Sequence, residues 1–174
     1  MILPSHSKPR IALLLSGFVG SIQGKRDASA PLKDEELIIA TLAKRHWDRY
    51  LLTDQNDIDI FIHTWSQHSA DMLNDLFSPK SIVAEPPITN SKEMQYLIDQ
   101  VRKNGIHCDN VPNTRMSQLI TVQRSHDLYF DYSQKTGATY DYIIFARPDL
   151  CLNQEIPFQK LKPNSIYRMH TPFH

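Results

Sequence analysis

Short apolar runs alternate with helical stripes along this chain, and the apolar runs predict strands. The run Ile11–Leu15 is too short for a helix and suits a buried parallel strand. Residues 57–65, DIDIFIHTW, alternate isoleucine with other side chains and predict a second strand. SIVAEPP, beginning at Ser81, predicts a short strand that two prolines end. YDYIIFA, ending at Ala146, predicts a fourth strand that is fully buried.

Apolar residues three or four positions apart predict helices between these strands. The stripes are Leu37 to Leu51, Met72 to Phe77, the set Met94, Leu97, Ile98 and Val101, and the set Met116, Leu119, Ile120, Gln123 and Phe130. The third helix is expected to begin at a capping-box pattern, Asn90 with Glu93, and to end at Gly105. The fourth is expected over Thr114 to about Lys135, where DLYFDYSQ suits a packing stripe better than a ligand site.

Strands that alternate with amphipathic helices predict an α/β layered domain with a mostly parallel central sheet flanked by helices. The 174 residues fit one domain of ordinary size, and no repeat or linker divides residues 1–174. We therefore expect a single domain over the whole chain.

Charge and cysteine content narrow the function classes. Nineteen basic residues balance nineteen acidic ones, so no overall field favours nucleic acid or an anionic membrane. No apolar run approaches the roughly 20 residues that cross a bilayer, and the N-terminus lacks a secretion-signal pattern. Cys108 and Cys151 form no C-x-x-C pair and suit a reducing compartment, as small buried or half-buried side chains. The expectation is a cytoplasmic protein with no membrane span and no nucleic-acid partner.

The residues that follow the predicted strands carry the candidate chemistry, because ligands of open parallel sheets bind outside the carboxyl ends of the strands. These residues are Ser16-Gly17, His63-Thr64-Trp65 and Arg147-Pro148-Asp149. Asp149 suits a divalent cation that bridges two phosphate oxygens, and Arg147 suits a phosphate, which its guanidinium fork can bind. The alternative is a structural ion pair, or an aspartate that caps the next turn.

The motif YDYIIFARPDL, together with IALLLSG near the start and DIDIFIHTW after the first helix, resembles a family of bacterial and viral glycosyltransferases. These are of the GT-A, or nucleotide-diphospho-sugar transferase, type, which has a Rossmann-like layered sandwich. In such enzymes a D-x-D motif at the end of a central strand holds Mn²⁺ or Mg²⁺ against the donor's diphosphate, and in this subgroup the motif is similar to R-x-D.

The resemblance implies a glycosyltransferase that moves a sugar from a nucleotide-diphospho-sugar donor to a glycan or other hydroxyl acceptor. It assigns the metal to Asp149 and gives Arg147 the place of the first acidic residue. It also places Ser16 and Gly17 against the nucleotide, with Trp65 or His63 near it. The chain ends 25 residues after Asp149, where such enzymes continue into an acceptor-binding half, so a truncated or reduced domain is expected.

Several alternatives stay open. Trp65 suits a nucleobase-stacking role and a core role equally, and His63 suits a structural role. LLSGFVGSIQG is also similar to the nucleotide loop of NAD(P)-dependent short-chain dehydrogenases, although the upstream glycine, the acidic residue after the second strand and the Tyr-x-x-x-Lys pair are missing. The domain could also bind a nucleotide or nucleotide-sugar without turning it over. No residue stands out as a catalytic base.

Overall fold

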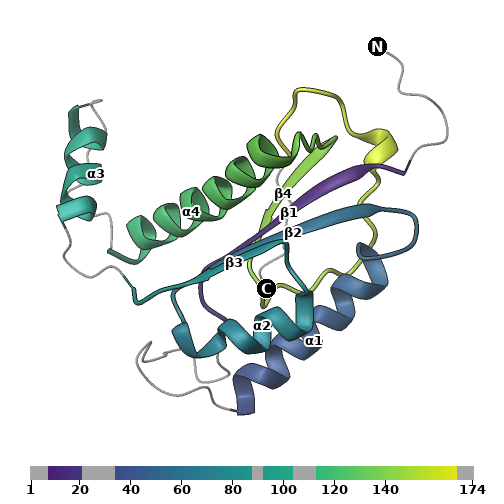
Figure 1. Cartoon of the computed structure of the whole chain (residues 1–174), viewed down its shortest axis with the longest axis horizontal. Helices are drawn as coiled ribbons and strands as arrows, with labels where there is room; N and C mark the ends of the chain where they lie inside the picture. Colours follow the sequence, from purple (N-terminus) through teal and green to yellow (C-terminus); the bar gives the residue numbers. More distant parts are fainter. Residues whose placement is uncertain (1–7, 21–33, 88–91, 104–112, 168–174) are drawn as a thin grey trace.

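A computed structural model describes residues 8–20, 34–87, 92–103 and 113–167 of the chain (Figure 1). Its strands are β1 (Arg10–Ser16), β2 (Asp57–Thr64), β3 (Ser81–Ala84) and β4 (Tyr142–Ala146). Its helices are α1 (Asp34–Tyr50), α2 (Ala70–Phe77), α3 (Lys92–Lys103) and α4 (Asn113–Thr136), with single 3₁₀ turns η1 (Gln67–Ser69) and η2 (Phe158–Lys160). Each predicted strand and helix is confirmed. Asn90 and Gly105 lie outside the described residues.

The four strands form one parallel sheet in the order β3-β2-β1-β4. The mostly parallel sheet that the sequence predicts is therefore confirmed. Leu14 of β1 lies in register between Phe61 of β2 and Phe145 of β4. The chain steps outward from β1 to β2 and β3, and then returns through α4 to β4 on the other side of β1. The direction of winding thus reverses between β1 and β4.

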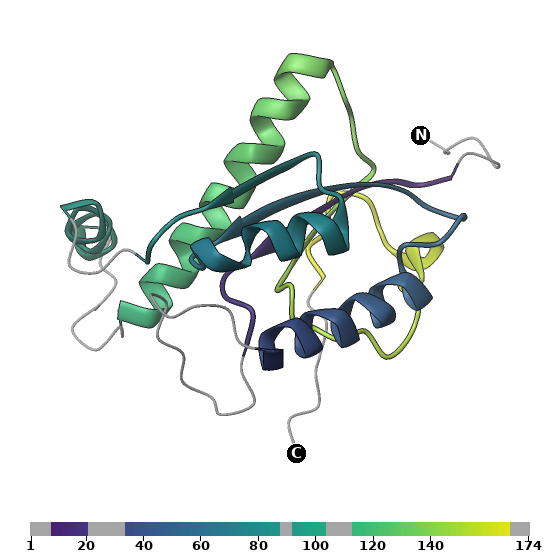
Figure 2. The same ribbon diagram turned by 60° about the horizontal axis from the view of Figure 1, so that its bottom comes forward.

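Helices cover the two faces of the sheet differently (Figure 2). On one face, Leu13 and Leu15 of β1 pack in the main core with Trp47 of α1 and Leu73 of α2. On the other face, Leu14 and its neighbours pack against α4. Successive residues of β1 point to opposite faces, so one strand supplies side chains to both cores. This explains why its five apolar residues form an unbroken run.

The buried face of α4 agrees only in part with the apolar stripe predicted for it, since Met116 and Ile120 are buried. Tyr129 and Tyr132 pack edge-on against Phe61, with ring centroids 5.9 and 5.4 Å away, which confirms the packing role of the tyrosine-rich segment. Leu119 and Phe130, however, are exposed. Two of the buried positions of α4 are the polar residues Thr121 and Ser125, whose hydroxyls are hydrogen-bonded. Their polarity hid the buried face from a pattern that counts apolar residues.

The predicted stripe of α3 can be followed at one position. Ile98 packs against the small core cluster of Trp65, Met116 and Ile120. The side chains of its three companions in the stripe lie outside the described set.

The prediction that β4 is fully buried is wrong. Ile143 is 42% exposed and Phe145 is 46% exposed. Because β4 is an edge strand, and α4 packs on β1, β2 and β3, these two side chains are only partly covered. The opposite face of β4 is better covered, since Tyr142 packs on Phe158 of the segment that follows the strand.

A buried aspartate, Asp59, lies near the end of the sheet that is opposite to the predicted site. The carboxylate of Asp59 accepts a hydrogen bond of 2.7 Å from the hydroxyl of Tyr140, and Lys80 and Arg10 lie 3.4 and 3.5 Å from it. Burial and this hydrogen bond raise the pKa of Tyr140. Protein groups therefore satisfy Asp59, in keeping with its position at the start of a strand rather than at a carboxyl end.

Candidate functional site

The loop after β1 meets the turn after β4 at the carboxyl edge of the sheet. Gly17 has a φ of +104°, a conformation that favours glycine, and its N–H donates to the carbonyl of His63 over 3.0 Å. This bond ties the start of the loop to the end of β2. The loop then brings Gly20 beside Asp149. Ser16, the last residue of β1, is buried.

Arg147, Pro148 and Asp149 form a tight turn at the end of β4. The N–H of Leu150 donates to the carbonyl of Arg147 over 3.2 Å, and Pro148 between them is buried. The guanidinium of Arg147 binds the Asp149 carboxylate with both prongs of its fork, Nε to Oδ1 at 2.8 Å and Nη2 to Oδ2 at 2.6 Å. The structural ion pair that the sequence left open as an alternative is therefore present.

Gly20 is a contact of Asp149 that the sequence reasoning missed. Its N–H donates to Asp149 Oδ2 over 2.7 Å, and a Cβ built on Gly20 would lie 2.4 Å from the same oxygen. That distance is far inside van der Waals contact, so a side chain at this position would displace the carboxylate. The signal was present in the sequence as the second glycine of SGFVG, but only the fold shows what approaches it.

The ion pair has a protected carboxylate and an exposed guanidinium. The side chain of Asp149 is 12% exposed and that of Arg147 is 53% exposed. The hydrogen bonds to Asp149, followed by its negative charge, raise the pKa of Arg147, so the guanidinium stays protonated. Burial and then the charge of Asp149 raise the pKa of the Cys151 thiol nearby. Cys151 is exposed, which corrects the expectation of a buried or half-buried cysteine, and Cys108 lies outside the described residues.

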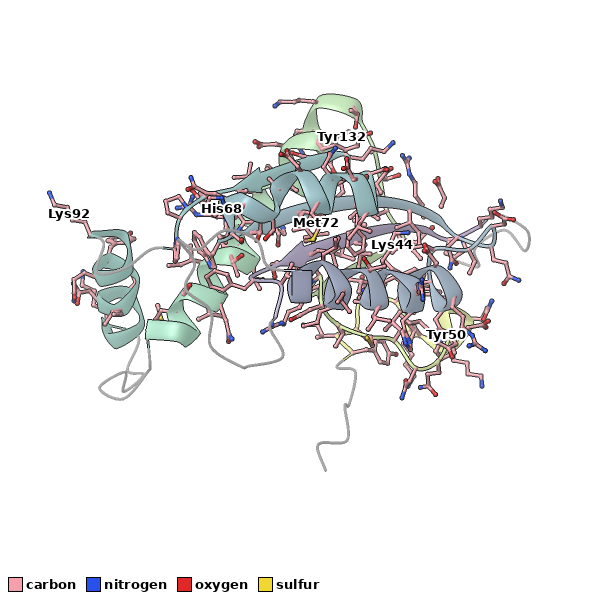
Figure 3. The ribbon with its side chains drawn as sticks, turned by 90° about the horizontal axis from the view of Figure 1, so that it is seen from below. Lys44, Tyr50, His68, Met72, Lys92 and Tyr132 are labelled. Carbon is pink, nitrogen blue, oxygen red and sulfur yellow. The ribbon has the colours of Figure 1, made fainter. Side chains whose placement is uncertain are left out.

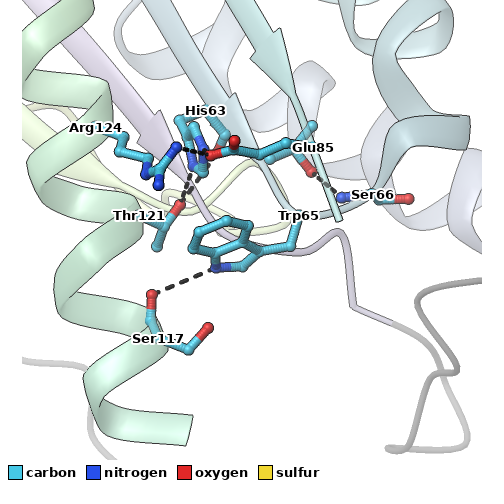
Figure 4. Close-up of polar contacts among 8 residues, drawn as sticks. His63, Trp65, Ser66, Glu85, Ser117, Thr121 and Arg124 are labelled. Atoms are coloured by element: carbon cyan, nitrogen blue, oxygen red, sulfur yellow. Dashed lines mark hydrogen bonds and ion pairs between the residues drawn. The ribbon is translucent and has the colours of Figure 1, made fainter. Parts of the chain in front are cut away.

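A second polar cluster lies at the carboxyl ends of β2 and β3, beneath α4 (Figure 4). His63 Nδ1 is 2.6 Å from the Thr121 hydroxyl, and His63 Nε2 is 2.7 Å from a carboxylate oxygen of Glu85. The same oxygen of Glu85 accepts a hydrogen bond from Arg124. Burial lowers the pKa of His63, and the hydrogen bond to Glu85 opposes that shift without cancelling it. Both ring nitrogens of His63 thus have protein partners.

Trp65 belongs to the same cluster and to the core. Its Nε1–H donates to the carbonyl of Ser117 over 3.3 Å, and its ring packs against the His63 ring in a T-shaped arrangement at a centroid distance of 4.6 Å. The guanidinium of Arg124 lies 5.7 Å from the ring centroid. Trp65 and His63 are each 1% exposed. Of the two roles the sequence allowed for Trp65, the described contacts are those of a core residue.

The structure therefore divides the predicted site residues into two groups. Arg147 and Asp149 lie at the end of β4, where Asp149 meets Gly20 of the loop that Ser16 and Gly17 begin at the end of the neighbouring strand β1. His63 and Trp65 lie at the end of β2 and pack against α4. That these predicted site residues approach a bound nucleotide stays a prediction. Sequence reasoning also missed Glu85, Thr121 and Arg124, whose only signal was a charge directly after β3 and polar residues on a helix.

The metal role predicted for Asp149 can be tested against its donor set. Both carboxylate oxygens of Asp149 already accept hydrogen bonds, one of them from Arg147 and Gly20 together. Within the described ranges, no three His, Cys, Asp or Glu side chains come together as a metal site. A dication at Asp149 would also lie beside the guanidinium. In this arrangement the described residues do not fit a divalent cation, and we derive no step through one.

Comparison with protein-family models, curated proteins and solved structures finds no match to this chain. Among the described residues, no helix is both long and apolar enough to cross a membrane.

Proposed function

We propose that this chain binds a nucleotide-diphospho-sugar at the carboxyl ends of β1 and β4 and transfers the sugar to a glycan or other hydroxyl acceptor. One observation carries the proposal: the R-P-D turn and the SGFVG loop meet where the winding of the sheet reverses. Ligands of open α/β sheets bind in the crevice at such a reversal, outside the carboxyl ends of the strands. The proposal includes a GT-A type of fold, which is more specific than the parallel α/β class described above.

Arg147 has the chemistry and the exposure to meet a diphosphate. Its guanidinium is held in one orientation by the fork on Asp149, yet half of the side chain is open to solvent. Arginine binds phosphate through planar, charge-assisted hydrogen bonds. Gly17 has open space at the position a side chain would take, and the absence of a side chain at Gly20 lets the loop close on Asp149. Asp149 is in this reading a positioning residue for Arg147 and for the loop.

In the proposed reaction the acceptor oxygen forms a bond to the anomeric carbon as the bond from that carbon to the diphosphate oxygen breaks. The electron pair of the broken bond leaves with the nucleoside diphosphate, where Arg147 stabilises the added charge. The acceptor loses its hydroxyl proton, and no described residue is assigned as the base that takes it. The predicted dependence on Mn²⁺ or Mg²⁺ is tested separately, by measuring donor binding with and without metal.

A thermal-shift panel of UDP-, GDP-, CMP- and dTDP-sugars and NAD(P), each with and without Mn²⁺, tests the proposal. A ligand at about 100 times its Kd adds roughly 2.7 kcal/mol of stability. In a domain of this size that corresponds to an increase in Tm of several degrees. We expect a shift with one nucleotide-diphospho-sugar, clearly reduced in Arg147→Gln and kept in Arg45→Gln, an exposed arginine of α1.

The outcomes separate the alternatives. A shift with NAD(P) alone supports the dehydrogenase reading, and no shift with any nucleotide-sugar contradicts the proposed site. Release of the nucleoside diphosphate in the presence of glycan acceptors distinguishes a transferase from a domain that only binds the donor. A shift that requires Mn²⁺ supports the metal role of Asp149, and a shift without metal contradicts it.

A further inference from the structure

The edge strand β4 presents an unusual row of side chains on the face that α4 leaves partly open. Along residues 141–147 every second residue is exposed, and the four exposed residues are Asp141, Ile143, Phe145 and Arg147. Among the described residues β4 pairs with β1 alone, so the backbone groups on its outer side have no strand partner. Figure 1 shows β4 at this border of the sheet. An exposed apolar edge strand invites pairing with another strand.

The order of this row is acidic, apolar, apolar, basic, and it is self-complementary. When two copies of β4 run antiparallel with Ile144 at the twofold axis, Ile143 of one copy faces Phe145 of the other. In the same register Asp141 faces Arg147 of the second copy at both ends. Residues directly opposite each other on an antiparallel pair interact, and aromatic with β-branched pairs and opposite charges are favourable.

We propose that β4 pairs antiparallel with β4 of a second copy of this chain and joins the two sheets edge to edge. Two identical edges can pair in parallel only if one sheet is turned over, which puts the exposed row of one copy on the opposite face from the row of the other. Only the antiparallel arrangement lets the row pair with itself. The inference goes beyond the proposed function and shares Arg147 with the proposed site, so the dimer is tested at Ile143 and Phe145, to which the proposed function assigns no role.

The opposite face of β4 is compatible with this pairing. Tyr142 and Ile144 pack beneath the sheet against residues of the 150–161 segment, so the new strand would extend the sheet without opening that core. Within one chain the Asp141 carboxylate accepts a hydrogen bond of 2.8 Å from the backbone N–H of Arg10, and Arg147 uses Nε and Nη2 on Asp149. Both groups keep hydrogen-bonding capacity for each other across the pair, since a carboxylate has two acceptor oxygens and a guanidinium has five N–H donors.

Sedimentation equilibrium of the full chain over a range of concentrations tests the dimer. We expect the native chain to dimerise and Ile143→Lys to raise the dimer Kd at least tenfold, because it adds a charge to the centre of the interface. Val83→Lys is the matched control, since Val83 is an exposed apolar residue on β3, the opposite edge strand. Circular dichroism and Tm show that each variant is folded. A native chain that is monomeric throughout, or a dimer that Val83→Lys weakens as much as Ile143→Lys does, overturns the proposal.

Disulfide trapping tests the register even if Ile143→Lys fails to fold. In chains carrying Cys108→Ser and Cys151→Ser, one batch receives Ile143→Cys and the other Phe145→Cys. Mixed under oxidised glutathione, the two batches are expected to form a mixed disulfide dimer in preference to either symmetric dimer. Equal yields of all three dimers, or none, contradict the antiparallel register.

Discussion

Two groups of charged side chains lie at the carboxyl edge of the same sheet, and they differ in how they are used. At the β2 end, His63 is buried and both of its ring nitrogens contact protein groups, Thr121 and Glu85. At the β4 end, the Asp149 carboxylate is protected while the Arg147 guanidinium that binds it remains half exposed. Figure 3 shows the side chains of the sheet and of the helices that cover it.

The difference shows how a structural polar cluster can be told from a candidate binding site. Residue type alone does not separate the two, because each combines a carboxylate and an arginine. What separates them is which group faces solvent. The His63 cluster joins α4 to the sheet, so its loss should affect stability. The Arg147 pair presents a fixed cation at the reversal of the sheet, so its loss should affect ligand affinity.

The largest expected effect is on stability, at the buried cluster. Trp65→Ala removes a fully buried indole and should cost about 3–5 kcal/mol of unfolding free energy, measured by urea denaturation. Trp65→Phe keeps most of the apolar volume and should fold. If Trp65→Phe keeps its stability but loses nucleotide-sugar affinity, Trp65 is a ligand contact, and the contrast between the two groups fails.

Gly20→Ala should have the next largest effect, because the new Cβ would meet Asp149 Oδ2 at 2.4 Å. Overpacking of this kind costs about 1–3 kcal/mol, and here it should also weaken nucleotide-sugar binding by displacing Asp149 and Arg147. Gly137→Ala is the control. Gly137 has a φ of +70° and open space where a Cβ would lie, so this substitution strains the backbone without touching the proposed site. An unchanged affinity in Gly20→Ala would remove the loop from the proposed site.

Arg147→Gln should change stability little and affinity more. The guanidinium of this ion pair is half exposed, and ion pairs at the surface contribute about 0–1 kcal/mol to stability, so denaturation should shift little. Loss of charge-assisted hydrogen bonds to a diphosphate should weaken donor binding roughly 10- to 100-fold, measured by isothermal titration calorimetry. A large loss of stability with unchanged affinity would show that Arg147 is structural, like the His63 cluster.

The pH dependence of stability should be the subtlest effect, and it should come from the His63 cluster. Burial lowers the pKa of His63 in the folded chain below its ordinary value of 6.5, so the unfolded chain takes up the proton first as the pH falls. The stability that comes from keeping His63 neutral and buried is therefore fully present above about pH 6.5, and it is lost as the pH falls toward the pKa of His63 in the folded chain. Urea midpoints from pH 8 to 5 should fall less steeply for His63→Asn than for His68→Asn, an exposed control. Equal slopes would contradict a neutral buried His63.

The local pattern of apolar and polar residues predicted the strands and helices well, but it predicted the surroundings of single side chains poorly. The apolar runs and stripes located every described strand and helix, because each reflects the backbone period of one segment. The same patterns were right for part of α4, where Met116 and Ile120 are buried, and missed the buried polar residues Thr121 and Ser125. Arg147 and Asp149 were found because they are close in the sequence. Gly20 was not, because it meets Asp149 only through the adjacency of β1 and β4.

The sequence by itself determined the alternation of strands and helices, the parallel α/β class and the residues that follow each strand. Those features depend on the spacing of apolar side chains within a segment. The tertiary structure decided that β4 is an edge strand, that His63 is enclosed and that Gly20 closes on Asp149. These depend on strand order and helix docking, which bring distant residues together and are set by packing free energy summed over the whole chain rather than by any one segment.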